Sequence, residues 1–294
     1  MERRVVVTGI GVVSPIGNTK EEFWDGIVKG KNGIDLITKF DTTNHRCKVA
    51  GEVKNLNFED YFERRDINRL DDYTKYAIIA SREAMKDSNL INEEFDHDRF
   101  GVFVSSGIGG LTTIQTEVTK LAEKGPNRVS PMFIPMAISN MASGNVSIEF
   151  EAYGPSHSIT TACASSTHAI GEAYNYIKYD LADVMIAGGS EASVNEIGIA
   201  GFDALKALSN ATDTSRASIP FDKERSGFVM GEGAGILILE DYEHAKKRGA
   251  KIYAEVVSYA STCDAYHVTS PNGEGASKAM ELAINRANIN TEDI

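Results

Sequence analysis

The sequence predicts an α/β fold in which helices are layered against a sheet. Short apolar or β-branched runs, typical of buried strands, alternate with longer amphipathic segments, typical of helices. Apolar residues make up 42% of the 294 residues, so a full hydrophobic core can form. As a third observation, two distant segments share the pattern of a helix that ends in a polar turn. The alternation of strand and helix patterns predicts the α/β class. The repeat is a single match that is also compatible with chance.

The first third of the chain reads as a strand followed by two helices. Residues 4–8 are β-branched and predict a strand that ends in a Gly-x-Gly sequence. This is no dinucleotide-binding turn, because Ser14 stands where that motif has its third glycine. Residues 19–29 predict a helix with a capping threonine and acidic residues in its first turn. Residues 70–89 predict a longer amphipathic helix.

The middle of the chain adds three buried strands and a packed helix. Residues 100–104 predict a strand closed by the glycine-rich run 107–110, which no Lys-Ser/Thr pair follows, so it is not a phosphate-binding loop. Small and apolar residues predict one tightly packed helix in 131–150. Residues 184–187, ended by two glycines, and residues 236–239 predict further strands.

The repeat joins residues 80–85 with residues 279–284. Both are followed at the same intervals by an asparagine, Asn89 or Asn288, and by further matching residues. We expect both helices to end in a polar turn.

Charge and cysteine content limit the classes of function. The formal net charge is −12, whereas a general nucleic-acid binder is normally basic. Three cysteines without CxxC spacing indicate a reducing compartment and no disulfide framework. No run approaches the ~18 apolar residues of a membrane span, and no apolar signal region follows the N-terminus. We therefore expect a soluble cytoplasmic protein that binds neither nucleic acid nor membrane; no residue cluster has metal-ligand spacing.

Cys163 is the candidate nucleophile. A Gly-Pro turn leads into the run 157–162, which predicts a strand, and the segment after Cys163 has Ile170, Tyr174 and Ile177 at helical spacing. The thiol would thus stand at a helix start, where the helix dipole and free N–H groups favour a thiolate. An inert buried cysteine is the alternative, and the local pattern leaves both open.

The segment Thr161-Ala162-Cys163-Ala164-Ser165-Ser166 resembles the nucleophile motif of the β-ketoacyl-acyl-carrier-protein synthases. Further blocks resemble that family in the same order: 5–11 with Ser14-Pro15, 105–110, 187–191, 220–223 and 264–267. The resemblance covers the whole chain and is closest to the type II elongating synthases. It implies a thiolase-like layered α-β-α-β-α fold built from two similar halves. Residues 1–250 would form the first half and residues 251–294 would open the second, beginning with a strand at 253–257, with the remainder absent.

The resemblance also implies a reaction. An acyl group passes from the phosphopantetheine arm of an acyl carrier protein to Cys163. Malonyl-carrier then loses CO2, and its carbanion attacks the thioester to give a 3-oxoacyl-carrier two carbons longer. No cofactor would be bound, because the substrate carrier brings the arm.

Two histidines, a lysine and a Phe-Gly loop complete the site in the family, in blocks that would follow Ile294. None of the six histidines present is a convincing substitute: His157 is interpreted as structural, and His168 as facing away from the thiol. We therefore expect the parent protein to condense, and residues 1–294 alone to have lost decarboxylation and condensation.

Other roles follow from the resemblance alone. Ile108 and Phe202 would line the acyl pocket, Phe133 would reach into the pocket of the other subunit of a homodimer, and His267, Thr269 and Ser270 would lie beside the pantetheine arm. Arg64, Arg65, Arg69, Arg128 and Lys206 would dock the acidic carrier protein. Ordinary core packing and a solvated charged face are the respective alternatives. The strand before Cys163 would pair with its twin across the two-fold axis.

Three other functions compete with this one. A thiolase would use coenzyme A and a second cysteine, for which Cys263 is available. A chain-length-factor-like scaffold would be non-catalytic; Cys163 argues against it for the parent protein, whereas for residues 1–294 alone a dimerising, non-catalytic role remains an alternative. A cysteine hydrolase is weakened by the lack of a Cys-His-Asn/Asp pattern.

Overall fold

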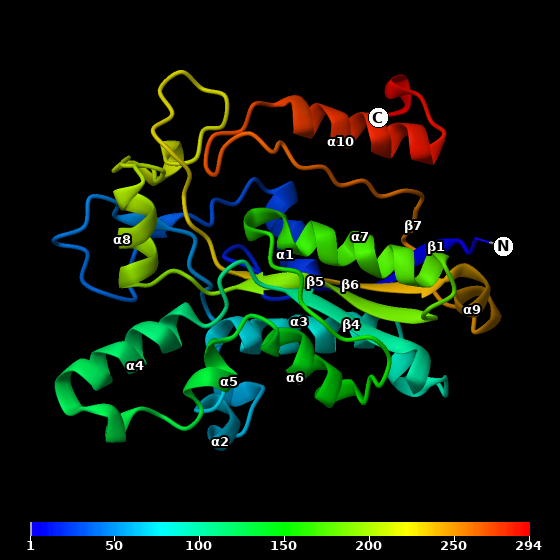
Figure 1. The fold of residues 1–294 in the computed structure, drawn as a ribbon, viewed down its shortest axis with the longest axis horizontal. Coiled ribbons are helices and arrows are strands. Elements are labelled where there is room, and N and C mark those ends of the chain that lie inside the picture. Colours follow the sequence, from blue (N-terminus) through cyan, green and yellow to red (C-terminus); the bar gives the residue numbers. More distant parts are fainter. Residues whose placement is uncertain (1) are drawn as a thin grey trace.

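The computed structural model describes residues 2–294, and its centre is a five-stranded mixed sheet (Figure 1). Only the first two strands in spatial order, β4 and β5, are parallel, and every other pair is antiparallel. The spatial order is β4 (Phe100–Ser105), β5 (Val184–Glu191), β6 (Gly233–Asp241), β1 (Val5–Val13) and β7 (Ala254–Val256). The predicted α/β class is confirmed.

Helices cover both faces of this sheet. Helices α3 (Asp72–Asp87) and α6 (Met141–Phe150) pack on one face, and α7 (Ser165–Lys178) packs on the other (Figure 1). Each face has its own apolar core, because strand residues alternate between the two sides. A further helix, α10 (Glu274–Ala287), lies beyond α7. The result is a layered helix–sheet–helix arrangement with an additional helix outside it.

The remaining elements surround one end of the sheet or connect its layers. They are α1 (Lys20–Val28), α2 (Arg64–Ile67), α4 (Leu111–Lys124), α5 (Phe133–Ala137), α8 (Glu196–Ala204), α9 (Tyr242–Lys247) and the strand pair β2 (Asp35–Leu36) and β3 (Val49–Ala50). In residues 2–294 no helix is long and apolar enough to cross a membrane. The same residues contain no cluster of His, Cys, Asp and Glu that could hold a metal ion.

Most of the predicted elements are present. Helix α1 begins as predicted, with the Thr19 hydroxyl accepting the Glu22 N–H at 3.2 Å. Helix α3 and strand β4 also match their predicted ranges closely. Strands β1 and β5 are longer than predicted, because both continue through glycines that had been taken as their ends.

Two predicted elements were wrong. Residues 131–150 form two helices, α5 and α6, because the chain turns extended at Ile138, whose carbonyl accepts the Tyr73 hydroxyl at 2.6 Å. Residues 157–162 are not a strand. This segment runs beside β4, with the His157 N–H on the Val102 carbonyl, but Ser156 forms only an isolated bridge and no second strand lies outside it in residues 2–294.

Both repeated helices end as predicted. Asn89 after α3 and Asn288 after α10 adopt left-handed backbones, with φ of 62° and 55°. A short 3-10 turn follows each of them, at Leu90–Asn92 and Thr291–Asp293. The strand expected to open a second half is β7, which pairs with β1 in the same sheet. The division at residue 250 therefore stays a prediction.

Candidate active site

Cys163 lies where an irregular segment turns into a helix. It occupies a single 3-10 turn, η5 (Ala162–Ala164), that runs directly into α7. Its thiol is exposed. The predicted position at a helix start is thus confirmed, although the segment leading into it is not a strand.

Hydrogen bonds hold the turn that carries Cys163. Ala162 adopts a left-handed backbone with φ of 52°, which is costly for a residue with a side chain. The Ser165 hydroxyl offsets this cost, because it accepts the Thr161 N–H at 2.8 Å and donates to the Ala162 carbonyl at 2.7 Å. On the far side, the Thr161 hydroxyl contacts Nδ1 of His168 at 2.8 Å. The sulfur is therefore presented on a fixed turn.

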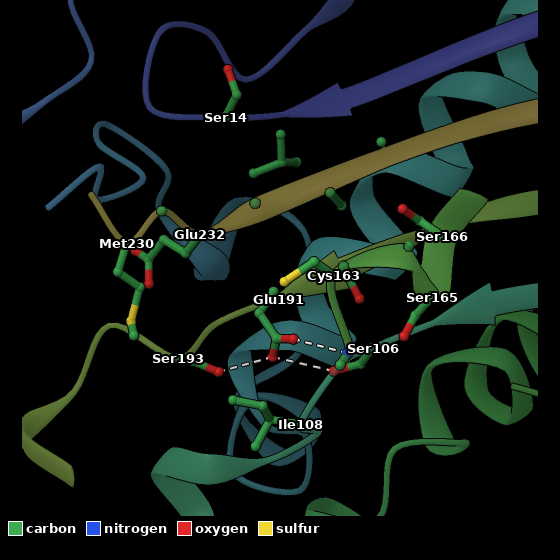
Figure 2. Close-up of a pocket in the computed structure, with 18 of the residues that line it drawn as sticks. Ser14, Ser106, Ile108, Cys163, Ser165, Ser166, Glu191, Ser193, Met230 and Glu232 are labelled. Atoms are coloured by element: carbon green, nitrogen blue, oxygen red, sulfur yellow. Dashed lines mark hydrogen bonds between the residues drawn. The ribbon is translucent and has the colours of Figure 1, made fainter. Parts of the chain in front are cut away.

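The thiol opens into a cavity of about 740 Å³ at the end of the sheet (Figure 2). The ends of β1, β4, β5 and β6 and the first turn of α7 contribute its wall. Gly189 brings β5 close to α7, since a Cβ there would lie 2.7 Å from Cβ of Ser166. This size suits a small ligand or an acyl chain, and much of the wall is apolar or small.

Two carboxylates also line the cavity, of which Glu191 is half-buried and Glu232 is buried. Glu191 accepts the Gly107 N–H at 2.9 Å and the hydroxyls of Ser106 at 3.2 Å and Ser193 at 2.9 Å (Figure 2). Burial raises the pKa of Glu191, and these hydrogen bonds oppose the rise.

Glu232 is the second carboxylate. It accepts the Val53 N–H at 3.0 Å and pairs with the Lys39 ammonium at 2.6 Å. Burial raises its pKa, and the charge of Lys39 opposes the rise.

The structure brings together three of the predicted site residues. Ile108 and Phe202 line the same cavity as Cys163. Phe133, on α5, is half-buried and does not line the cavity of its own chain. Its reach into a second subunit stays a prediction.

The predicted arm-binding residues lie elsewhere. His267, Thr269 and Ser270 are on an exposed loop and do not line this cavity. Nδ1 of His267 accepts the N–H groups of the other two, at 3.1 and 3.2 Å. Their contact with an arm stays a prediction, as does the role of the docking residues.

All five predicted docking cations are exposed. Arg65 contacts Asp66 at 3.3 Å, but within residues 2–294 the other four form no ion pair. These four are Arg64, Arg69, Arg128 and Lys206.

Sequence reasoning missed Glu191, Ser106, Ser193 and Glu232 as site residues. The signal for Glu191 was available, since an acidic residue that ends a Gly-Gly strand next to a nucleophile helix points to the same sheet edge. None of the six histidines lines the cavity in the part of the chain described, and neither does any lysine or arginine.

The fold and the site define a class: an α/β protein with an exposed cysteine thiol at a cavity beside the end of its sheet. The model of the β-ketoacyl synthase N-terminal domain matches residues 2–245. The chain belongs to this family of condensing acyltransferases of fatty acid or polyketide synthesis.

Similar proteins agree with this assignment. The chain is 49% identical over 294 residues to 3-oxoacyl-[acyl-carrier-protein] synthase 2 of Staphylococcus aureus (strain COL), covering 99% of this chain and 71% of that protein. It is 46% identical to the enzyme of the same name from Synechocystis sp., with the same shares covered. Among solved structures, the ishigamide ketosynthase/chain length factor superposes with a TM-score of 0.92 at 32% identity, covering 100% of this chain and 72% of the other. A ketosynthase in complex with its type II PKS acyl-carrier protein superposes with a TM-score of 0.88 at 34% identity, with the same coverage.

Proposed function

We propose that Cys163 is the acyl-carrying nucleophile of a fatty-acid-elongating condensing enzyme. Its thiolate attacks the thioester of an acyl carrier protein, the phosphopantetheine thiolate leaves, and the acyl group stays on Sγ. Malonyl-carrier then loses CO2, its enolate carbon attacks the new thioester, and the Cys163 thiolate leaves. The product is a 3-oxoacyl-carrier two carbons longer. The observation that supports this most is the position of Cys163 on a fixed turn above the cavity.

The backbone at this turn supports the chemistry. The N–H of Cys163 has no acceptor within residues 2–294, so it is available to the oxyanion that forms when the thioester is attacked. The cavity next to it, with Ile108 and Phe202 in its wall, has room for the acyl chain. The phosphopantetheine arm arrives on the carrier, so the protein itself needs no resident cofactor.

Residues 1–294 by themselves supply only the first of the two steps in this proposal. Decarboxylation needs polar groups that stabilise the enolate, and the described cavity wall contains no histidine or lysine. We therefore expect the chain on its own to acquire an acyl group without releasing CO2 from malonyl-carrier.

The test is to incubate the chain with acyl carrier protein charged with a long acyl group and measure the mass of the peptide that contains Cys163. We expect one acyl adduct on the wild type and none on Cys163→Ala, with no CO2 from malonyl-carrier in either case. Absence of the adduct from the wild type would contradict the proposal. Equal acylation by acyl-coenzyme A would favour the thiolase alternative, and CO2 release by this chain would contradict the division of steps.

The carrier and a second copy of the chain are the proposed partners. Exposed Arg64, Arg69, Arg128 and Lys206 have no acidic partner of their own in residues 2–294 and can attract an acidic carrier. The segment before Cys163 supports dimerisation. Its Ser158 and Thr160 N–H groups have no acceptor in residues 2–294, as at the open edge of a sheet.

A further inference from the structure

One turn forms part of the cavity wall beside Cys163, and the carboxylate of Glu191 accepts hydrogen bonds from it. This turn (Ser106–Gly109) follows β4 and carries Ile108 into the cavity wall. Glu191 accepts the Gly107 N–H directly, and it accepts the Ser106 hydroxyl. Oγ of Ser106 in turn accepts the Gly109 N–H at 2.8 Å. The carboxylate thus fixes the turn at three places, one of them through a relay.

The turn 106–109 also packs closely against two other parts of the site. A Cβ on Gly107 would lie 3.0 Å from Oε2 of Glu191 and 3.3 Å from the carbonyl oxygen of Ala162, the residue before the nucleophile. On the opposite side, a Cβ on Gly109 would lie 2.6 Å from the Ala137 carbonyl, at the end of α5. A shift of the turn 106–109 therefore also displaces the turn that carries Cys163 and the end of α5.

The carboxylate is well placed for this role. Glu191 is the last residue of β5, so its backbone belongs to the rigid sheet. It lies below the Cys163 sulfur in Figure 2, between Ser106 and Ser193. Hydrogen bonds to a carboxylate are charge-assisted and therefore stronger than those between neutral groups, and Glu191 is half-buried.

We propose that Glu191 is a positioning residue that holds the turn 106–109, and with it Ile108, and thereby sets how fast long acyl groups reach Cys163 relative to short ones. The inference deepens the proposed function and rests on it. If the hold is weakened, Ile108 can move out of the cavity, so long chains gain relative to short ones.

Three variants separate this role from a merely structural one. Glu191→Gln keeps the shape of the side chain but leaves it one acceptor oxygen, whereas in the wild type the donors bond to both carboxylate oxygens. Ser106→Ala removes only the hydroxyl that links the Gly109 N–H to the Glu191 carboxylate. Ser193→Ala is the matched control, because it removes a hydroxyl from the same carboxylate oxygen without cutting a bond to the turn.

The first measurement is hydrogen exchange of peptides that contain residues 106–110. We expect exchange at Gly107 to rise at least tenfold in Glu191→Gln, and exchange at Gly109 to rise at least tenfold in Ser106→Ala, with no rise in Ser193→Ala. The second is the ratio of Cys163 acylation rates with 16-carbon and 8-carbon acyl-carrier. We expect it to rise at least threefold in the first two variants and to stay within twofold in Ser193→Ala.

The outcomes distinguish the inference from the proposed function. If no carrier acylates the wild type, the proposed function fails, while the exchange rates still decide whether Glu191 holds the turn. If the wild type is acylated but the ratio is the same in all variants, or exchange is unchanged, the positioning role is overturned. If Glu191→Gln does not fold, Ser106→Ala decides alone, because it leaves the carboxylate and the Gly107 bond in place.

Discussion

A single buried carboxylate, Glu240, ties together three elements away from the site. It accepts the Thr8 hydroxyl at 2.8 Å, Nδ1 of His244 at 2.6 Å and two guanidinium nitrogens of Arg248 at 2.7 Å each. Burial raises the pKa of Glu240, but the hydrogen bonds from Arg248, His244 and Thr8 and the charge of Arg248 outweigh it and hold the pKa below its usual value. The cluster joins β6, β1 and α9.

We expect Glu240→Gln to lower the free energy of unfolding by about 3 kcal/mol at pH 7, because it leaves the Arg248 charge buried without its partner. A carboxyl whose pKa is depressed in the folded state stabilises above its unfolded pKa, about 4.3, and this stabilisation is lost as pH falls through the folded pKa. The difference between wild type and variant should therefore shrink below about pH 4. Urea unfolding at both pH values measures it.

Asp25→Asn is the control, since it breaks an exposed pair with Lys29 and should change little at either pH. A difference in unfolding free energy between wild type and Glu240→Gln that stays the same from pH 7 to well below pH 4 would show that the carboxylate charge is not the cause.

At the scale of elements, the backbone of α3 lies very close to β1 at Gly11. A Cβ on Gly11 would lie 1.8 Å from the Ala80 carbonyl oxygen. Side chains of the same helix also serve β1, since Asp87 accepts the Ile10 N–H at 3.0 Å and Glu83 the Val12 N–H at 2.7 Å. The helix therefore takes the place of a neighbouring strand where β7 ends.

Gly11→Ala should destabilise the protein by about 3 kcal/mol or more, because the helix backbone has to move away from the strand. Gly235→Ala is the matched control on the neighbouring strand β6, where no atom lies within 4 Å of the added Cβ. Thermal unfolding compares the two. Similar midpoints for both variants would mean that α3 can shift at little cost.

The contact of β1 with α3 and the break between α5 and α6 show how far the sequence could predict the fold. The alternation of strand and helix patterns predicted β4, α1 and α3, because their signals are local. The glycines of β1 were taken as its end, since the reason for them, Ala80, lies about 70 residues away in the chain. The break between α5 and α6 depends on the Tyr73 hydroxyl, which no local pattern reveals.

The candidate site, like the fold, could be predicted from the sequence only in part. The position of Cys163 followed from the turn before it and the helix after it. The place of Glu191 at the sheet edge had a signal in the sequence, but its partners did not, because Ser106 and Gly107 lie 85 and 84 residues away and meet it only when β4 and β5 pair.

For the molecule as a whole, the open question is assembly. The inward N–H groups of His157 and Ile159 are bonded to the chain itself, and the outward Thr160 N–H is not bonded within residues 2–294. If two copies pair along this segment, Thr160→Pro should produce a monomer, since it removes an outward donor. Thr160→Ala keeps that donor and should remain a dimer of twice the chain mass. Light scattering after size-exclusion chromatography distinguishes these states; a dimeric Thr160→Pro protein, or a monomeric wild type, would contradict pairing along this edge.

The two edges of the sheet differ, and this difference limits how many copies of the chain can pair with it. On one border, β7 spans three residues, and the carboxylates of Asp87 and Glu83 occupy β1 beyond it. On the other, the segment beside β4 has outward N–H groups without acceptors in residues 2–294. A second copy that binds there by two-fold symmetry consumes the free border of both molecules. The assembly then stops at a pair, and the sheet cannot extend into a fibre.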